Sequence, residues 1–416
     1  MTSTALFTDQ YELTMLSAAL RDGSAHRSCT FEVFARRLPG GRRYGVVAGT
    51  GRFLDALRDF RFGEAELDSL AFLDPDTLAW LRDYRFGGDI DGYREGELFF
   101  PGSPILSVRG TFAECVILET LALSIYNHDS AIAAAAARMV SASDGRPLIE
   151  MGSRRAHEEA AVASSRAAYI CGFSATSNLE AVRRHGIPGA GTSAHAFTLL
   201  HTDANGPDEA AAFRSQIAAL GVGTTLLVDT YDITAGVATA VEVAGPELGG
   251  VRIDSGDLGV LARQVRRQLD DLGATGTRIV VSGDLDEYAI ASLRAEPVDT
   301  YGVGTSLVTG SGAPTAGMVY KLVEVDGIPV AKRSSHKESR GGRKRAVRLA
   351  RRTGTVDPQD MTGNPRALAQ PHARSGRAFR GRTRLRDPST SPTSSAARRH
   401  SSFLNPVWLA TNPSRS

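Results

Sequence analysis

Cysteine is scarce in this sequence, and long apolar runs are absent. Cys29, Cys115 and Cys171 are the only cysteines, and their wide spacing provides neither a metal-binding pair nor a disulfide framework. No apolar run is long enough to cross a bilayer. Residues 1–11 lack the basic and apolar segments of a secretory signal. These absences predict a protein of the reducing cytoplasm that does not enter a membrane.

Residues 357–416 lack glutamate, isoleucine and tyrosine. They hold seven of the 18 prolines, and ten arginines against three aspartates. Such a composition buries little apolar surface, so we predict a disordered or non-native tail. The formal net charge of +2 comes from this tail, because the preceding residues are net acidic. The folded part is therefore not expected to bind a specific nucleic acid, and non-specific RNA binding by the Arg-rich tail is an alternative activity.

A regular alternation of strand and helix signals occupies the middle of the chain. Residues 112–140 carry apolar side chains at helical spacing. Short apolar runs that end in small or polar residues then alternate with helical segments; the runs are PLIEMGSRR, AAYICGFSATSN, GIPGAGTSAH, TTLLVDTYD, GGVRIDSGD, TRIVVSGD and TYGVGTS. This alternation predicts an α/β protein with an irregular β/α barrel. A doubly wound open sheet is the alternative.

The segments on either side of the barrel differ from it. Residues 1–111 mix short strand and helix signals, which predicts an N-terminal α+β domain. The catalytic barrel is expected over residues 112–320. Residues 321–356 are expected to form a hairpin around Asp326-Gly327 and a basic segment that returns to the N-terminal domain. The tail over residues 357–416 completes the predicted organisation.

Polar residues gather where the predicted strands end, which is where a β/α barrel carries its site. Arginines, aspartates, glycines and one histidine occur there, in a pattern that suits a phosphorylated sugar. Glycine lets backbone N–H groups approach phosphate, helix N-termini favour anions, and arginine binds phosphate or carboxylate as a planar fork. Aspartates bind sugar hydroxyls or Mg²⁺.

The stretch GAGTSAHAF, residues 189–197, surrounds His195 with small residues. Taken alone, a single histidine is more often structural, DSGD is consistent with a helix N-cap, and GVGT is consistent with a glycine turn. Their shared position at strand ends favours a binding site, in which the small residues leave room for a ligand.

Eight segments occur in one order, namely TDQYELTM, EMGSRRAHE, GTSAHAF, VDTYD, VRIDSGDL, VSGDLDE, YGVGTSLVT and KRSSHKESRGGRK. Together they resemble the nicotinate phosphoribosyltransferase family from about residue 6 to about residue 353. The resemblance implies an enzyme of NAD biosynthesis that joins nicotinate to phosphoribosyl pyrophosphate, with ATP as co-substrate and Mg²⁺ as cofactor. It also implies a homodimer with shared active sites. A quinolinate- or nicotinamide-using phosphoribosyltransferase is the alternative enzyme.

The resemblance also implies roles for individual residues. His195 matches a phosphorylated histidine, and Arg252 and Asp254 are the other predicted catalytic residues. Nicotinate binding is implied for Tyr11, which a partner subunit would supply, and for Met151, Arg154, Ser177, Thr192 and Arg252. Binding of the phosphoribosyl group and phosphates is implied for Arg154, Arg155, Ser255, Gly256, Gly283, Asp284, Gly302, Gly304 and Thr305. The resemblance assigns no metal ligand.

Two positions depart from related enzymes, and the likeness ends before the chain does. Met151 stands where an aromatic residue is common, and a thioether packs on a ring less rigidly. Ser177 stands where the related amide-using enzyme has an acid; a hydroxyl donates to the carboxylate of nicotinate, whereas an aspartate would repel it. The acid is therefore the expected substrate. The likeness stops near residues 351–355, and a reading-frame change is one explanation for the sequence beyond.

Overall fold

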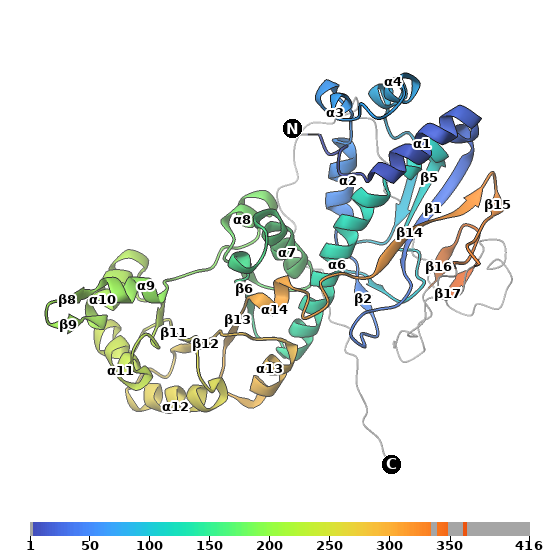
Figure 1. The fold of residues 1–416 in the computed structure, drawn as a ribbon. Helices are drawn as coiled ribbons and strands as arrows, with labels where there is room; N and C mark the ends of the chain where they lie inside the picture. Colours follow the sequence, from blue (N-terminus) through green and yellow to red (C-terminus); the bar gives the residue numbers. More distant parts are fainter. Residues whose placement is uncertain (1–2, 334–338, 348–360, 364–416) are drawn as a thin grey trace, which may run out of the picture.

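The computed structural model describes residues 3–333, 339–347 and 361–363. Two hydrophobic cores organise these residues. One lies under an antiparallel sheet and its helices, formed by the N-terminal part of the chain, and the other lies inside a curled parallel sheet with helices outside it (Figure 1). The expected combination of an N-terminal α+β unit and a β/α barrel is therefore present.

The N-terminal sheet has the order β15-β14-β1-β5-β3. Its strands are β1 (Ser28–Ala35), β3 (Asp89–Gly92), β5 (Leu106–Thr111), β14 (Met318–Val325) and β15 (Ile328–Pro329). Strand β1 is buried along all but its first residue, because antiparallel neighbours flank it on both sides. The helices beside this sheet are α1 (Gln10–Asp22), η1 (Ser24–His26), α2 (Thr50–Arg58), α3 (Glu64–Asp68) and α4 (Pro75–Asp83), and a small ribbon joins β2 (Gly45–Val46) to β4 (Leu98–Phe99).

The predicted hairpin after the barrel is confirmed. Strands β14 and β15 pair across Asp326 and Gly327, whose φ angles of 48° and 78° are those of a tight two-residue turn. Strand β14 pairs with β1, so the chain returns to the N-terminal sheet at β14. The predicted boundary at residue 320 falls inside this strand. Strand β16 (Arg345–Val347) pairs with β17 (Met361–Gly363), which lies in the predicted tail. The other residues of that tail lie outside the described residues.

The parallel sheet confirms the predicted irregular barrel. Its order is β10-β11-β12-β13-β6-β7, with β6 (Leu148–Glu150), β7 (Ala175–Thr176), β10 (Thr225–Leu227), β11 (Gly250–Ile253), β12 (Arg278–Val281) and β13 (Thr300–Val303). The first strand pairs with the last, as it does in a closed barrel and not in a doubly wound sheet. The third apolar run, GIPGAGTSAH, forms a single bridge, Thr176–Gly189. In the described part of the chain no pairing joins this run to β10, so a seam stays open there.

Most barrel helices begin at an acid or amide directly after a strand. The helices and turns are η2 (Ser153–Arg155), α7 (Glu158–Ile170), α8 (Leu179–His185), α9 (His195–Leu200), α10 (Glu209–Leu220), α11 (Ile233–Ala244), α12 (Leu258–Asp271), α13 (Glu287–Ser292), η3 (Leu293–Ala295) and α14 (Thr305–Val308), with a ribbon of β8 (Thr202–Asp203) and β9 (Gly206–Pro207). Asp257 caps α12 through the backbone N–H of Val260. Of the two aspartates in DSGD, Asp257 is thus the cap, and Asp254 stays available to the site.

Helix α6 (Glu119–Ala142) belongs to both cores. Its first half, with Leu121 and Tyr126, packs under the N-terminal sheet, and its second half, with Ile132 and Met139, packs in the barrel core. The predicted helix over residues 112–140 is divided, because α5 (Phe112–Val116) ends before α6 begins. The predicted boundary between residues 111 and 112 therefore precedes a helix that the two cores share.

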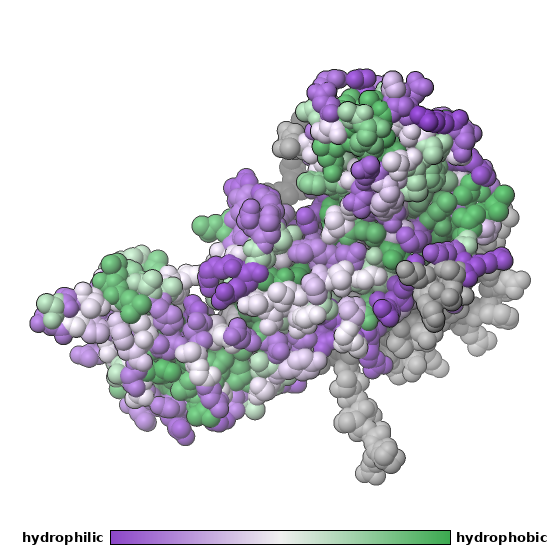
Figure 2. Space-filling model, viewed as in Figure 1, coloured by the Kyte–Doolittle hydropathy of each residue, from purple (hydrophilic) through white to green (hydrophobic). Residues whose placement is uncertain are grey.

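Apolar side chains stay exposed on two parts of the chain. On α1 and just before it, Phe7, Tyr11 and Met15 follow one another at helical spacing and are exposed. Leu199 and Leu200 of α9 are exposed as well, and Figure 2 shows an apolar group on the end of the barrel that carries α9 and α10. Exposed apolar faces of this kind occur at protein interfaces.

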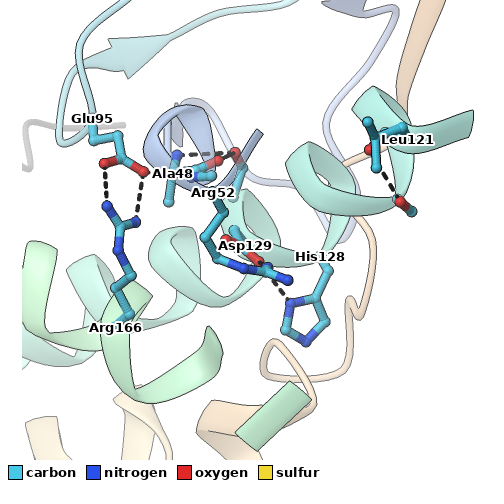
Figure 3. A network of polar contacts seen from close by, with 10 residues as sticks. Ala48, Arg52, Glu95, Leu121, His128, Asp129 and Arg166 are labelled. Atoms are coloured by element: carbon cyan, nitrogen blue, oxygen red, sulfur yellow. Dashed lines mark hydrogen bonds and ion pairs between the residues drawn. The ribbon is translucent and has the colours of Figure 1, made fainter. Parts of the chain in front are cut away.

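Polar contacts around the middle of α6 join the two units (Figure 3). Arg166 of α7 donates two hydrogen bonds of 2.7 Å to the carboxylate of Glu95, which also accepts the backbone N–H of Gly49. On α6, Asp129 accepts a hydrogen bond of 2.6 Å from Arg52. Burial acts to raise the pKa of Glu95, but the hydrogen bonds from Arg166 outweigh it and hold that pKa below its usual value. The Glu95–Arg166 pair is therefore a charged link between the N-terminal unit and α7.

We expect Glu95→Gln to destabilise the protein by about 2 kcal/mol or more, because Arg166 is left largely buried without its counter-charge. The pair stabilises the fold fully at pH values above the pKa of a glutamate in the unfolded chain. This stabilisation is lost as the pH falls through the lower pKa that Glu95 has in the folded protein. The difference in Tm between wild type and variant should therefore shrink in acid.

The control is Arg82→Met, which breaks the exposed Arg82–Glu64 pair and should cost at most about 1 kcal/mol. Thermal unfolding followed by circular dichroism measures both variants. Equal losses in the two variants, or no loss in Glu95→Gln, would contradict the assignment of an interdomain link.

Candidate active site

The barrel strands deliver the predicted site residues to one edge of the sheet. The end of β11 and the turn after it carry Arg252–Ser255, the turn after β12 carries Ser282–Asp284, and the end of β13 and the residue after it carry Gly302–Gly304. The close approaches show that these segments are in contact: a Cβ on Gly283 would lie 2.4 Å from the carbonyl oxygen of Asp254, and one on Gly302 would lie 2.8 Å from the sulfur of Met151. The sequence-predicted loops therefore form one continuous surface.

His195 is the first residue of α9 and lies beside the ends of β10 and β11, which β12 and β13 separate from β6 in the sheet order. Its Nδ1 is 3.1 Å from the hydroxyl of Thr230, and its Nε2 is 3.9 Å from carboxylate oxygens of both Asp229 and Asp254. The side chain is 42% exposed, so a ligand can reach the ring. The arrangement provides an accessible imidazole with two carboxylates near one nitrogen, which can orient the ring.

Arg252 and Asp254 are held together by a serine that sequence reasoning did not single out. The Nε of Arg252 donates to the hydroxyl of Ser282 at 2.8 Å, and its Nη2 donates to Asp254 at 2.7 Å. The same hydroxyl of Ser282 donates to Asp254. Burial acts to raise the pKa of Asp254, but the hydrogen bonds from Ser282 and Arg252 outweigh it, so the pKa lies below its ordinary value. Asp254 is thus a stable anion with its second oxygen facing His195.

Asp229, at the end of the β10 run, was also missed. One of its oxygens accepts the backbone N–H of Asp254 at 2.8 Å and the hydroxyl of Ser255 at 2.9 Å. The other oxygen is buried without a hydrogen-bond partner and is the one that faces His195. The segment VDTYD belonged to the family resemblance, and this strand-end aspartate was the available signal. Asp229 fixes the backbone on which Asp254 and Ser255 stand.

Met151 packs against the end of β13. Its sulfur packs over Gly302, where any side chain would displace it. Gly152 is equally constrained, because a Cβ there would lie 2.3 Å from Val308 and 3.0 Å from the carbonyl oxygen of Gly304. These glycines let the loops after β6 and β13 approach each other closely.

The predicted anion-binding residues remain open to a ligand. Arg154 and Arg155 are exposed at the turn η2, and among the described residues neither side chain forms an ion pair or a hydrogen bond. Gly283 has a φ of 115°, a conformation that favours glycine, and Asp284 follows it with a φ of 45°. Gly256, with a φ of 87°, precedes the cap of α12, and Thr305 begins α14 after Gly304.

Three predicted nicotinate residues differ in how the structure places them. Ser177 lies beside the loop of Met151, because its backbone N–H donates to the carbonyl of Glu150 at 2.8 Å. Thr192 is exposed in the segment before His195. Tyr11 is not brought to this site within the chain. Burial and the nearby carboxylate of Glu119 raise the pKa of its phenol, which places it at the start of α6.

A further carboxylate, Glu209, adjoins this acidic group from the start of α10 and was not predicted. Burial, together with the charges of Asp229 and Asp232, raises its pKa to about 7. One of its oxygens is buried without a hydrogen-bond partner. Glu209 therefore changes charge near neutral pH, next to the aspartate that faces His195.

Among the described residues, no group of three or more histidine, cysteine, aspartate or glutamate side chains is arranged to hold a metal ion. No helix in the described part of the chain combines the length and apolar character needed to cross a membrane.

The fold and the site define a β/α-barrel protein whose strand ends present free arginines and glycine turns to an anionic ligand, beside an accessible histidine. Residues 6–127 match the nicotinate phosphoribosyltransferase (NAPRTase) N-terminal domain, and residues 147–357 match the nicotinate phosphoribosyltransferase (NAPRTase) family. The chain belongs to the nicotinate phosphoribosyltransferase family.

Individual relatives agree with this assignment. The chain is 71% identical over 373 residues to nicotinate phosphoribosyltransferase pncB1 of Mycobacterium tuberculosis, covering 88% of this chain and 83% of the relative. It is 38% identical over 370 residues to nicotinate phosphoribosyltransferase of Bacillus subtilis, covering 83% and 73% of the two chains. The structure of human nicotinic acid phosphoribosyltransferase superposes with a TM-score of 0.73 at 29% identity, covering 86% and 81%.

We expect Glu209→Gln to change how stability depends on pH. Because the folded-state pKa of Glu209 lies above that of an unfolded glutamate, the folded wild type holds this proton more tightly and loses stability as the pH rises from about 4.5 to about 7. The glutamine variant cannot lose stability in this way. Its Tm relative to wild type should therefore increase by a few degrees between about pH 5 and about pH 8.

Glu180→Gln is the control for this measurement. Hydrogen bonds from Arg183 and Arg184 lower the pKa of Glu180 to about 2, so this carboxylate keeps its charge across the same range. Its replacement should give a Tm difference that does not vary with pH. Parallel pH profiles for Glu209→Gln and wild type, measured by scanning fluorimetry, would show that Glu209 does not titrate near 7.

Proposed function

We propose that this enzyme couples its reaction to ATP through phosphorylation of His195. The overall reaction is that of the family: nicotinate displaces pyrophosphate from 5-phosphoribosyl 1-pyrophosphate and forms nicotinate mononucleotide, a step in NAD biosynthesis. The observation that carries the proposal is the exposed His195 ring, held between Thr230 and two carboxylates at the barrel mouth. The family match favours nicotinate over quinolinate as the substrate.

The surroundings of His195 suit a nucleophile. The unpartnered oxygen of Asp229 favours the tautomer that carries its proton on Nε2, which leaves the lone pair of Nδ1, now beside Thr230, for attack on the γ-phosphate of ATP. The new N–P bond replaces the bond from the γ-phosphorus to the bridging oxygen, and ADP leaves. Gly191 and Ala194 add little bulk near the ring, so a phosphoryl group can be accommodated.

The nicotinate site is proposed beside β6. Met151 supplies an apolar surface for one face of the ring, and Arg154 and Arg252 are the cations available to the carboxylate. Ser177 and Thr192 add hydroxyl donors. Arg252 is already oriented by Ser282 and Asp254, so the cost of ordering its side chain on binding is reduced.

The phosphoribosyl group is proposed to lie over the glycine turns. The backbone around Gly283, Gly302 and Gly304 is close-packed and without side chains, which lets N–H groups approach a phosphate. Arg155, Ser255, Gly256, Asp284 and Thr305 surround this region in the same proposal. Asp254 is the catalytic carboxylate that faces the ribose.

Mg²⁺ is proposed to bind together with the substrate phosphates. Among the described residues none donates a hydrogen bond to the second oxygen of Asp254, which lies 3.9 Å from Nε2 of His195; this fits a site of one carboxylate and phosphate oxygens. The bound cation would neutralise the charge of the pyrophosphate. Arg252 and Ser282 keep Asp254 ionised for that purpose.

A homodimer with shared sites is proposed as the working form. Within one chain Tyr11 lies near Glu119, and Phe7, Tyr11 and Met15 form an exposed apolar face. Burying that face against a second copy would bring the partner subunit's Tyr11 to the open side of the nicotinate slot opposite Met151. A cytoplasmic location remains a prediction from the sequence.

The test of the ATP step is phosphorylation by γ-labelled ATP. Wild type should acquire acid-labile label, and His195→Ala should not, because the imidazole nucleophile is missing. His201→Ala is the matched control: His201 ends the same helix, and its Nδ1 contacts the carbonyl of Phe197 at the end of α9 away from the site. Equal labelling of wild type and His195→Ala would refute the assignment.

The test of shared sites is subunit complementation between Tyr11→Ala and His195→Ala, each of which should lose ATP-stimulated turnover alone. A mixed dimer has one site with both native residues, so an equal random mixture should recover about a quarter of the wild-type sites. Native mass spectrometry verifies that mixed dimers form. Proven mixed dimers without recovered activity would rule out sharing through Tyr11.

A further inference from the structure

Glu150, the last residue of β6, is fully buried, yet it contacts only neutral hydrogen-bond donors. One carboxylate oxygen accepts the backbone N–H of Gly152. The other accepts the hydroxyl of Ser165 at 2.8 Å and the hydroxyl of Thr176. Among the described residues no cationic side chain forms an ion pair with Glu150.

A buried carboxylate without a counter-ion is costly, because desolvation strongly disfavours the charge. Neutral donors offset part of that cost when each is well aligned. An apolar residue of similar size would fill the same space without the cost. The retained carboxylate therefore points to a role in arranging its donors.

The donors of Glu150 come from three separate elements. Gly152 lies in the turn that carries Arg154, Ser165 lies on α7, and Thr176 ends β7 before Ser177. The contacts continue beyond the carboxylate: the hydroxyl of Thr176 accepts the backbone N–H of Asn178 at 3.0 Å.

Two more bonds complete the connection between the loops. The side-chain amide of Asn178 donates to Ser153 at 3.0 Å, and the backbone N–H of Ser177 donates to the carbonyl of Glu150 at 2.8 Å. The loop after β6 and the loop after β7 are thus tied to each other at both ends, with Glu150 buried between them.

We propose that Glu150 is a positioning residue that sets the distance between these two loops and thereby shapes the nicotinate slot. The proposal rests on the proposed placement of nicotinate beside Met151, Arg154 and Ser177. Glu150 itself touches no substrate, because it is fully buried. His195, by contrast, contacts Thr230 and the aspartates at the other side of the barrel mouth, and none of its contacts involves Glu150.

The first test variant is Glu150→Ala, which removes all three accepted bonds. Its KM for nicotinate should rise about tenfold or more, since hydrogen bonds to a charged group are lost from the support of two binding loops. Labelling of His195 by γ-labelled ATP should stay within about twofold of wild type, because the ring is held by other residues. A purely structural role would lower Tm and the fraction of active protein without changing the KM of the folded fraction.

The second variant is Thr176→Val, which keeps the buried volume and removes one hydroxyl donor. It should raise the nicotinate KM about threefold. If Glu150→Ala fails to fold, this variant alone tests the positioning role. The matched control is Glu114→Ala, because Glu114 also accepts only neutral donors, from Gly87 and Thr111, but lies in the N-terminal unit. It should leave the nicotinate KM unchanged.

The outcomes separate this proposal from the proposed ATP step. An unlabelled wild type would refute phosphorylation of His195 and leave the KM comparison intact. A nicotinate KM within about twofold of wild type in Thr176→Val and in folded Glu150→Ala would overturn the positioning role. An equal rise in the KM for phosphoribosyl pyrophosphate would also overturn it, because the effect would not be confined to the nicotinate slot.

Discussion

Helix α6 is the constraint on which the rest of the structure depends, because it supplies side chains to both cores. Its buried alanines, Ala133 to Ala136, let α7 pack closely against it, and α7 carries the two hydrophilic anchors Ser165 and Arg166. Ser165 binds Glu150 at the site, and Arg166 binds Glu95 of the N-terminal unit. The position of the loops beside β6 is therefore connected through two adjacent residues of α7 to the packing of the N-terminal unit.

The candidate site is built from buried or half-buried anions that are held by donors, with Arg252 paired to Asp254 and with Arg154 and Arg155 exposed. Asp229 fixes the backbone of Asp254, and Ser282 bridges Asp254 to Arg252. These bonds hold the carboxylates in place, and those from Ser282 and Arg252 keep the pKa of Asp254 below its ordinary value. An enzyme of this family must bind several anionic groups together, and such fixed charges reduce the reorganisation that binding requires.

The sequence indicated candidate ligand-facing residues more readily than the residues that hold them in place. Alternating apolar runs located the strands, and polar residues at the strand ends located His195, Arg252 and Asp254. Ser282, Asp229 and Glu150 lay in the same motifs, but their importance depends on contacts between strands that are far apart in sequence. The run GIPGAGTSAH was wrongly predicted to form a full strand; Pro188 lacks an N–H and glycines flank it, so only one bridge forms. The sequence did not indicate that α6 is shared between two cores, because the spacing of its apolar residues is the same in both halves.

The open seam of the barrel has a direct consequence for His195. In a closed barrel, a strand after Gly189 would pair with β10 and bring its end residues into the rim. Here Gly191, Thr192 and Ala194 are exposed, and a Cβ on Gly191 would have no atom within 4 Å. The segment that crosses the open seam consists of small residues, and α9 begins after it at His195. The imidazole therefore lies at the edge of the barrel rather than within it. A histidine at that edge can meet a second phosphorylated substrate from the solvent side while the barrel mouth holds the first. The open seam of the barrel is thus the structural feature on which the proposed coupling to ATP depends.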